Sequence, residues 1–248
     1  MVFAAFIGAF GTAFGSFLNV VAYRLPRGES IVAPPSHCPT CNEPIKARDN
    51  IPILSWLLLR GHCRNCKTAI SPRYPLIEAA TGALCVAAVL ATSSTVDAAL
   101  AVVLIFVLVP AAAIDLEYRV IPNPITGFGA IAAVLVGTIL DPAGEPTRLI
   151  AGVVAGGLLL IAALAYPKGM GMGDVKLAGV MGLCLGTAVA PAMFVALLAG
   201  VLVGAVLLAR GASRKTAIPF GPFLALGGLV AIFAGPALVT LYLGAVGA

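Results

Sequence analysis

The chain has 248 residues, of which 60% are hydrophobic and only 10% are charged, and its formal net charge is +5. A soluble domain is about half apolar and about a quarter charged, so this composition argues against a soluble globular protein and indicates a polytopic membrane protein. The basic excess does not indicate a nucleic-acid partner, because no basic segment carries the interleaved aromatic residues that stack on bases.

Eight apolar segments follow one another along the chain, and we expect each to be a transmembrane helix. Most are about 17 to 21 residues long, which lets a helix cross about 30 Å of hydrocarbon. Because the alternating pattern of barrel strands does not occur, the fold is predicted to be all-α. The predicted spans cover residues 2–22, 76–93, 98–114, 124–140, 149–165, 175–190, 192–209 and 218–243.

The spans suggest three segments along the chain. Residues 1–23 form a first transmembrane helix, which we expect to be retained because "YRLPRG" and not a small-residue cleavage site follows it. Residues 24–75 form a polar segment, and residues 76–248 a seven-helix membrane domain. The chain is therefore predicted to be an all-α polytopic membrane protein with a small insertion after its first helix.

The basic residues indicate how the spans are oriented. With eight spans, 14 of the 15 Lys and Arg residues fall on one side of the membrane, and only Arg148 falls on the other. The positive-inside rule assigns the basic side to the cytoplasm. We therefore expect both termini outside and the polar segment 24–75 in the cytoplasm of a bacterial inner membrane protein.

The polar segment contains two CxxC pairs, "CPTC" and "CRNC". Two such pairs are a common way to build a closed tetrahedral thiolate site, and the spacing is compatible with a zinc ribbon. Two disulfides are the alternative, which a reducing cytoplasm disfavours. Since four protein ligands leave no open position, the zinc is expected to be structural. The predicted ligands are Cys38, Cys41, Cys63 and Cys66.

Two histidines and two further cysteines need an interpretation of their own. His37 and His62 each precede a cysteine, so either one could replace a thiolate ligand; with four thiolates present we expect them to be bystanders or to support the ligands. Cys85 and Cys184 are isolated in apolar spans and are expected to be small buried residues.

Two aspartates stand out because ionised carboxylates are costly inside a bilayer. Asp115 ends the third predicted span in "AAAIDLEYRVIPNP", and Asp174 opens the sixth in "GMGMGDVKL". These spans run in opposite directions, so both carboxylates are predicted at the same level near the cytoplasmic face. Gly171 and Gly173 remove side chains beside Asp174, which permits unusual backbone angles and the close approach of another helix or an extended peptide.

Simpler roles remain open for these acids and their neighbours. Asp174 is also suited to capping the sixth helix, and Asp115 is one turn from Arg119 and suited to an ion pair. Glu117 and Lys176 either tune the aspartates or are solvated interface residues. The remaining acid of this kind, Glu78 at the start of the second span, is expected at the interface.

Two carboxylates held close together share one proton, because both cannot ionise cheaply. One can then act as a general base on water while the other, protonated, polarises a carbonyl. This is the chemistry of aspartyl proteases, which needs no metal and no covalent intermediate.

Several stretches of the chain resemble bacterial prepilin peptidases, also called type IV leader peptidases. "GMGD" at 171–174 is similar to the GxGD motif of intramembrane aspartyl proteases, a short pattern that is weak alone. "GSFLNVVAYRLPRG" at 15–28, the two CxxC pairs with the residues between them, and "ISPRYPLIEAATG" at 70–82 resemble the family in order along the chain. Many members have Asp two positions after the first catalytic Asp, where this chain has Glu117; that position is not the catalytic one.

The resemblance implies a bifunctional enzyme. Such enzymes cleave the short basic leader of prepilins or pseudopilins at the cytoplasmic face and then methylate the new N-terminus with S-adenosylmethionine. The family pattern assigns the catalytic aspartates to Asp115 and Asp174 and the metal cluster to the four cysteines. No glycine-rich dinucleotide fingerprint is present, so the methyl transfer rests on the resemblance alone.

Two other function classes compete with the peptidase. Paired intramembrane carboxylates and glycine-rich broken helices also occur in proton- or ion-coupled transporters. Against this, no internal repeat is evident in the spans and the carboxylates lie near one edge of the membrane. A zinc-ribbon scaffold for a secretion or pilus assembly would explain the cysteines but not the aspartates.

Overall fold

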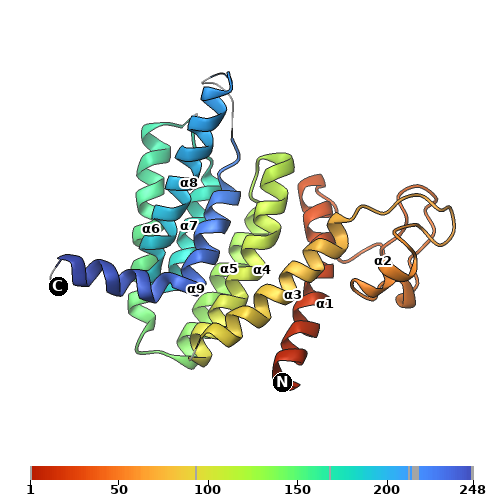
Figure 1. The fold of residues 1–248 in the computed structure, drawn as a ribbon, viewed down its shortest axis with the longest axis horizontal. Coiled ribbons are helices and arrows are strands. Elements are labelled where there is room, and N and C mark those ends of the chain that lie inside the picture. Colours follow the sequence, from red (N-terminus) through yellow and green to blue (C-terminus); the bar gives the residue numbers. More distant parts are fainter. Residues whose placement is uncertain (1, 93, 168, 212, 214–217, 247–248) are drawn as a thin grey trace. The chain divides into compact units, whose positions relative to one another are not determined.

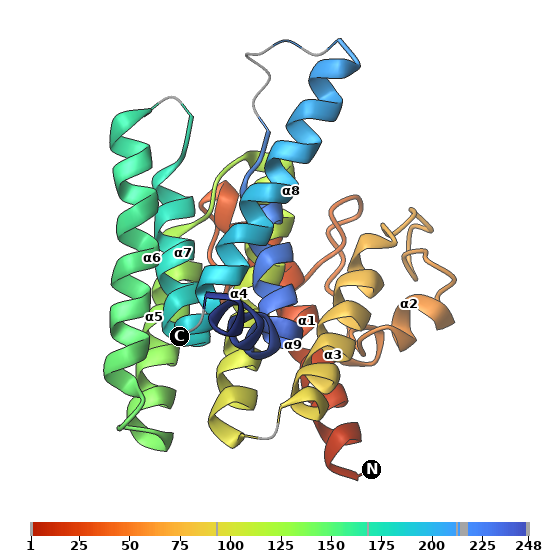
Figure 2. The same ribbon diagram turned by 60° about the vertical axis from the view of Figure 1, so that its left-hand side comes forward.

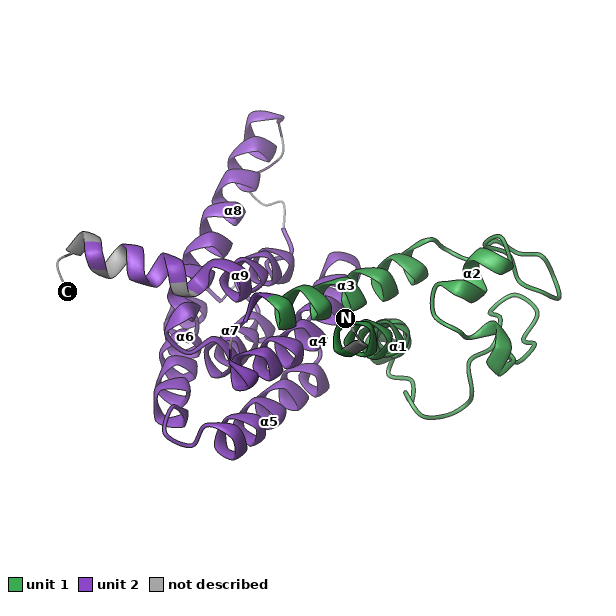
Figure 3. Ribbon diagram, turned by 60° about the horizontal axis from the view of Figure 1, so that its bottom comes forward, with its two compact units in different colours: residues 1–90 green, residues 91–248 purple. Residues whose placement is uncertain are grey.

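The protein is described by a computed structural model, which covers residues 2–92, 94–167, 169–211, 213 and 218–246 (Figure 1). These residues are helical or irregular and form no strand; two isolated β-bridges lie in the polar segment. The chain divides into two compact units, residues 1–90 and 91–248 (Figure 3). The three segments drawn from the sequence, with boundaries after 23 and 75, stay a prediction.

Unit 1 contains two long helices with the polar segment between them. The long helices pack closely because glycines face each other: a Cβ on Gly11 would lie 3.0 Å from the Cα of Gly82, and one on Gly15 would lie 2.9 Å from the Cα of Glu78. Small residues of this kind let membrane helices approach backbone to backbone. The elements of unit 1 are α1 (Val2–Arg24), η1 (Leu25–Arg27), η2 (Ala47–Asp49), α2 (Leu54–Leu58) and α3 (Arg73–Ala91).

Unit 2 is a helical bundle with α4 at its centre, where α4 packs against α5, α7 and α9 (Figures 1 and 2). The side chains of Leu104, Ile105 and Ile114 on α4 are fully buried. Further pairs form between α6 and α7 and between α8 and α9. The elements of unit 2 are α4 (Thr95–Tyr118), α5 (Asn123–Leu140), α6 (Glu145–Ala165), α7 (Met172–Leu185), η3 (Gly186–Ala188), α8 (Val189–Ala209) and α9 (Gly221–Val246).

The helices confirm the all-α, multi-pass membrane fold. Six segments of the described chain are long and apolar enough to cross a membrane, and the sixth, Met172–Ala209, has 38 residues. One straight helix of that length would measure about 57 Å, nearly twice the hydrocarbon thickness. Instead the chain turns at Gly186, where φ is +55°, and α7 and α8 run in opposite directions (Figure 2). The eight predicted spans count α7 and α8 separately and add α9, which begins with a shorter apolar stretch, Gly221–Gly235.

Arg148, the basic residue expected on the side opposite to the others, is held by two carboxylates. It is buried, its Nε donates to Glu145 at 3.1 Å, and its guanidinium donates to Asp141 at 2.9 Å. The same guanidinium lowers the pKa of Asp141. The charge of Arg148 is thus offset locally, so it adds little to the charge asymmetry between the two sides. Three other residues used for the orientation, Lys168, Arg214 and Lys215, lie outside the described residues.

Candidate active site and metal centre

Asp115 and Asp174 lie at the same end of unit 2. Asp115 is in the last turn of α4 and Asp174 in the first turn of α7, and these helix ends, with the start of α9, share one end of the bundle (Figures 1 and 2). Both side chains are buried, with 5% and 9% of their surface exposed.

Asp115 is held by the start of α9. The backbone N–H of Gly221 donates a hydrogen bond of 2.8 Å to its Oδ2. A Cβ on Gly221 would lie 2.8 Å from that oxygen and 3.1 Å from the Cβ of Asp115, so only glycine fits at this contact. Arg119, the other partner that the sequence allows, ends α4 in a left-handed conformation and donates its N–H to the Asp115 carbonyl. Within the described chain, the carboxylate's short-range partner is therefore Gly221.

Asp174 is held by the motif that precedes it. Its Oδ2 accepts the backbone N–H of Gly171 at 3.2 Å. Gly171, and not Asp174 as the sequence allowed, is the N-cap of α7, and Asp174 reaches back to it from the third position of the helix. Gly173 serves a different purpose, since a Cβ there would lie 2.9 Å from the Cβ of Ile121 and 3.3 Å from its backbone. Ile121 belongs to the connection between α4 and α5. The motif therefore lets the start of α7 pack closely against the connection that follows α4.

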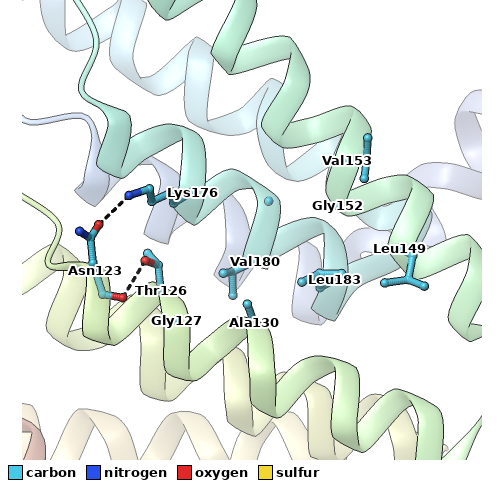
Figure 4. A pocket seen from close by; sticks show the side chains of 11 residues that line it. Asn123, Thr126, Gly127, Ala130, Leu149, Gly152, Val153, Lys176, Val180 and Leu183 are labelled. Carbon is cyan, nitrogen blue, oxygen red and sulfur yellow. Dashed lines mark hydrogen bonds between the residues drawn. The ribbon is translucent and has the colours of Figure 1, made fainter.

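The two charged neighbours of the aspartates are exposed. Glu117 lies on the surface of the last turn of α4. Lys176 donates from Nζ to Oδ1 of Asn123 at 2.8 Å, which joins α7 to α5. Lys176 and Asn123 stand at one end of a mainly apolar groove of about 470 Å³ between α5, α6 and α7, and Figure 4 shows Leu149 and Val153 at the far end. The charge of Lys176 is therefore held near the helix end that carries Asp174.

In unit 1, each CxxC pair sits in a turn of the same construction. In the first, the N–H of Cys38 donates to the Glu43 carbonyl and the N–H of Asn42 to the Cys38 carbonyl. In the second, Cys63 and Lys67 make the equivalent bonds. Asn42 and Lys67 both have a positive φ, and a β-bridge closes each turn, His37 with Pro44 and His62 with Ala69.

The four thiols gather where the two turns meet. All their sulfur atoms lie within 4.8 Å of one another, and the Sγ atoms of Cys38 and Cys66 are 3.7 Å apart. Tetrahedral zinc with Zn–S bonds of about 2.3 Å would separate sulfurs by about 3.8 Å, so the donor set fits a closed four-thiolate site. All six cysteines are free thiols, contrary to the disulfide alternative. Neither His37 nor His62 belongs to the cluster; each ring instead bonds through Nδ1 to a backbone carbonyl two residues earlier.

Electrostatics within the cluster favour a thiolate at one position. Hydrogen bonds from the backbone N–H groups of Cys41 and Thr40 lower the pKa of the Cys38 thiol to about 6. Cys66 differs: the backbone bond with Thr68 lowers its pKa, but desolvation and the neighbouring thiols outweigh this and raise it to about 11. The thiolate is the form that binds metal, so the backbone donors around Cys38 favour metal binding by this residue.

Unit 1 also contains a cavity of about 1000 Å³ between the long helices and the polar segment. Glu78 is buried in its wall, and its Oε2 accepts the N–H of Ile53 at 2.7 Å. Asn19 is buried in the same wall and donates to the Tyr74 carbonyl at 3.1 Å. The side chain is covered because α1 packs tightly on α3 at Gly15. Its position at the membrane interface stays a prediction.

Two family models match the chain. Residues 9–92 match the bacterial peptidase A24 N-terminal domain, and residues 102–209 match the type IV leader peptidase family. A protein of Aeromonas salmonicida named prepilin leader peptidase/N-methyltransferase is 35% identical over 94% of this chain and 91% of its own length. The chain belongs to the type IV leader peptidase family.

Two further relatives match the chain to a similar extent. Proteins with the same name from Legionella pneumophila and Bacillus subtilis are 33% and 34% identical, over 96% and 94% of this chain and 93% and 95% of their own lengths. No solved structure matches the chain. The family resemblance drawn from the sequence is confirmed.

Two residues of this family member escaped the sequence analysis. Gly221 contributes only a backbone N–H, and it lies 106 residues after the aspartate that it contacts. The stretch "IPFGPFLALGG" gave a usable signal, because prolines and glycines at the start of an apolar span mark a chain that must approach another closely. The second, Glu78, was noted but not connected to Ile53.

We expect the substitution Cys38→Ser to abolish stoichiometric metal binding, because a neutral hydroxyl does not replace a thiolate in a closed tetrahedral site. Metal content of the purified protein, measured by elemental analysis, checks this. Cys184→Ala, which changes a buried cysteine of unit 2 outside the cluster, is the matched control and should keep its metal. Full metal content in Cys38→Ser would contradict the ligand assignment.

Proposed function

We propose that this chain is a membrane aspartyl endopeptidase that cleaves the leader peptide of prepilins or pseudopilins, with Asp115 and Asp174 as the catalytic pair. The observation that carries the proposal is the placement of two buried carboxylates, 59 positions apart in sequence, at the adjoining helix ends on one end of unit 2. The names of the relatives support the substrate class, since they describe prepilin leader peptidases.

In the proposed reaction the pair holds one proton between its two carboxyl groups. The ionised group takes a proton from water as the water oxygen adds to the scissile carbonyl carbon, and the protonated group donates a hydrogen bond to the carbonyl oxygen. When the C–N bond breaks, the leaving nitrogen takes up the proton that came from water. The products are a leader with a free carboxyl group and a mature chain with a new N-terminal amine, and the pair is left with one proton.

Backbone groups would keep the pair in place during this reaction. Gly221 and Gly171 each donate one N–H to one carboxylate oxygen, at 2.8 and 3.2 Å. These bonds restrict both side chains while leaving other carboxylate oxygens for water and substrate. Preorganised groups need little rearrangement in the transition state, which is where their effect on rate comes from.

The orientation follows from the charge distribution. We place the helix ends that carry the aspartates, and the polar segment with its cysteines, on the cytoplasmic side of a bacterial inner membrane, with both termini outside. A prepilin with a basic leader and an apolar helix in the bilayer would then present its scissile bond at the level of the aspartates. We propose that the metal held by the four cysteines is structural zinc, because the fourth position is filled by protein.

We further propose that the enzyme methylates the new N-terminus with S-adenosylmethionine. The relatives' names support the activity. The cavity of unit 1 fits such a cofactor, because it is about 1000 Å³ in volume and lined by aromatic side chains and carboxylates that suit an adenine ring and a sulfonium cation. Bound there, S-adenosylmethionine would supply the methyl group, and residues such as Trp56 and Glu78 would hold it.

Replacing either aspartate by asparagine should reduce leader cleavage by about a thousandfold or more, because asparagine neither takes up nor donates the proton that the reaction moves. Purified variants incubated with a prepilin and analysed for the shortened product test this. Asp97→Asn, at the opposite end of α4 from Asp115, is the matched control and should cleave normally. Undiminished cleavage by either Asp115→Asn or Asp174→Asn would rule out the pair.

Gly221→Ala should lower cleavage by about tenfold to a hundredfold while the protein still inserts, because the added methyl group must push the Asp115 carboxylate from its place. The loss should appear in kcat more than in KM. Gly244→Ala adds the same group to the same helix in open space and serves as control. Equal activity of the two variants would show that the Gly221 contact does not position Asp115.

Mass spectrometry of the mature product should detect a gain of about 14 Da, the mass of one CH₂ group, only when S-adenosylmethionine is present. The gain should map to the N-terminal residue, since only cleavage exposes that amine. An uncleaved prepilin incubated with Asp174→Asn enzyme and S-adenosylmethionine is the control. Cleaved product without this gain would restrict the function to proteolysis.

A further inference from the structure

The short helix α2 in the polar segment has two different sides. Successive residues are about 100° apart around a helix. Ser55 and Trp56 therefore lie on one side of α2, and both line the cavity of unit 1. The opposite side carries Leu54, Leu57 and Leu58, whose exposed fractions are 56%, 57% and 80%. These three residues, which we call the leucine patch, form an apolar surface that faces away from the cavity.

The inner side of α2 is fixed by hydrogen bonds. The Ser55 hydroxyl accepts the N–H of Ile51 at 2.9 Å and donates to the Arg48 carbonyl at 3.2 Å. The Trp56 indole donates to the Ile70 carbonyl at 3.0 Å. These bonds prevent the helix from rotating its leucines inward. A helix that is apolar on all sides is normally buried, and adjoining exposed apolar side chains mark a surface that binds a partner or a membrane.

The start of α2 is held at the level of a membrane span. The N–H of Ile53, directly before α2, donates to the carboxylate of Glu78 at 2.7 Å. Glu78 is five residues into the candidate span Arg73–Ala91, which corresponds to about 7.5 Å along the helix axis. In Figures 1 and 2, α2 lies beside α1 and α3 at a level between the two ends of α1. Helices at a membrane surface bury their apolar side about 5–10 Å into the boundary between headgroups and acyl chains, so the level of α2 suits such a position.

The charge of the polar segment also suits a bilayer surface. Residues 24–75 contain eight Lys and Arg and three Asp and Glu, so their formal charge of +5 equals that of the whole chain. A zinc ion held by four thiolates would lower it to about +3. Arg48 and Arg60, on either side of the leucine patch in the sequence, are both exposed. Arginine can lay its apolar stem along a lipid surface while its guanidinium reaches the phosphates, and basic segments are attracted to anionic lipids.

We propose that the leucine patch inserts into the lipid bilayer at its interface and anchors the polar segment on the membrane surface. The inference goes beyond the proposed function and rests on neither the peptidase nor the methyltransferase activity. The bilayer is the occupant that both observations favour, because the patch lies at the level of a span and is flanked by arginines. Since Trp56 belongs to the same short helix, lipid on the outer side of α2 would also hold this wall of the cavity at the membrane surface.

Photolabelling of the unmodified full chain tests the location. The protein is reconstituted in vesicles of phosphatidylethanolamine and phosphatidylglycerol with a phospholipid that carries a diazirine high in one acyl chain. After irradiation and digestion, mass spectrometry should find lipid adducts within residues 54–58, at a yield within about threefold of that at Leu90, which is 70% exposed on α3. Adducts at Leu90 with none in 54–58 would overturn the proposal and assign the patch to a protein partner.

A pair of double variants tests whether apolar character holds the patch in the bilayer. Leu57→Asp/Leu58→Asp should lower the adduct yield in residues 49–60 by about tenfold or more, because carboxylates are costly in the hydrocarbon. Leu57→Phe/Leu58→Phe changes the same positions, stays apolar and should keep the yield. Unchanged metal content and unchanged adducts at Leu90 show that each variant is folded and inserted. Equal yields in the two variants would contradict insertion, and the labelling of the unmodified chain stands as evidence even if the aspartate variant fails to fold.

Discussion

The architecture of unit 2 depends on backbone contacts that leave no room for a Cβ atom. The contact of Gly221 with Asp115 and that of Gly173 with Ile121 bring the starts of α9 and α7 to the end of α4. Lipid tails are as apolar as leucine, so membrane helices gain little from burying apolar surface against each other, and close packing and hydrogen bonds have to hold them together. The glycines make that packing possible at the level of the two carboxylates. Larger side chains at these positions would keep the helix ends apart.

The sequence was most informative where the signal is local. Apolar segments of membrane-spanning length predicted each long helix, and the reversal of direction from one span to the next put Asp115 and Asp174 at one end. The two CxxC pairs likewise predicted the thiol cluster. Gly221 was missed because the prolines and glycines around it mark a close approach but not the partner, and its contribution to Asp115 is a backbone N–H 106 residues away. The buried position of Glu78 was missed because it depends on how tightly α1 packs on α3, and that depends on glycines scattered along two helices.

Asp174 illustrates why a structural role and a chemical one need not compete. Its carboxylate accepts the N–H of Gly171, the N-cap of α7, from the third position of the helix. A carboxylate used as base or acid must also be held still, and the first turn of a helix does this with donors that the backbone leaves unpaired. The glycines before it make the cap compact enough for the connection after α4 to pack against it. The capping role therefore supports the catalytic assignment, because it explains how the group is oriented without a second side chain.

In unit 1, the metal site and the cavity are parts of one connected structure. The second cysteine turn ends at Ile70, whose N–H donates to the Gly61 carbonyl and whose carbonyl accepts the Trp56 indole. Gly61 has a positive φ, and a Cβ there would lie 2.9 Å from the Trp56 ring. Trp56 in turn lies on α2, which begins directly after Ile53, and the N–H of Ile53 donates to the Glu78 carboxylate. A metal that closes the cysteine turns would therefore also fix the cavity wall, to which two of its ligands, Cys38 and Cys63, themselves belong.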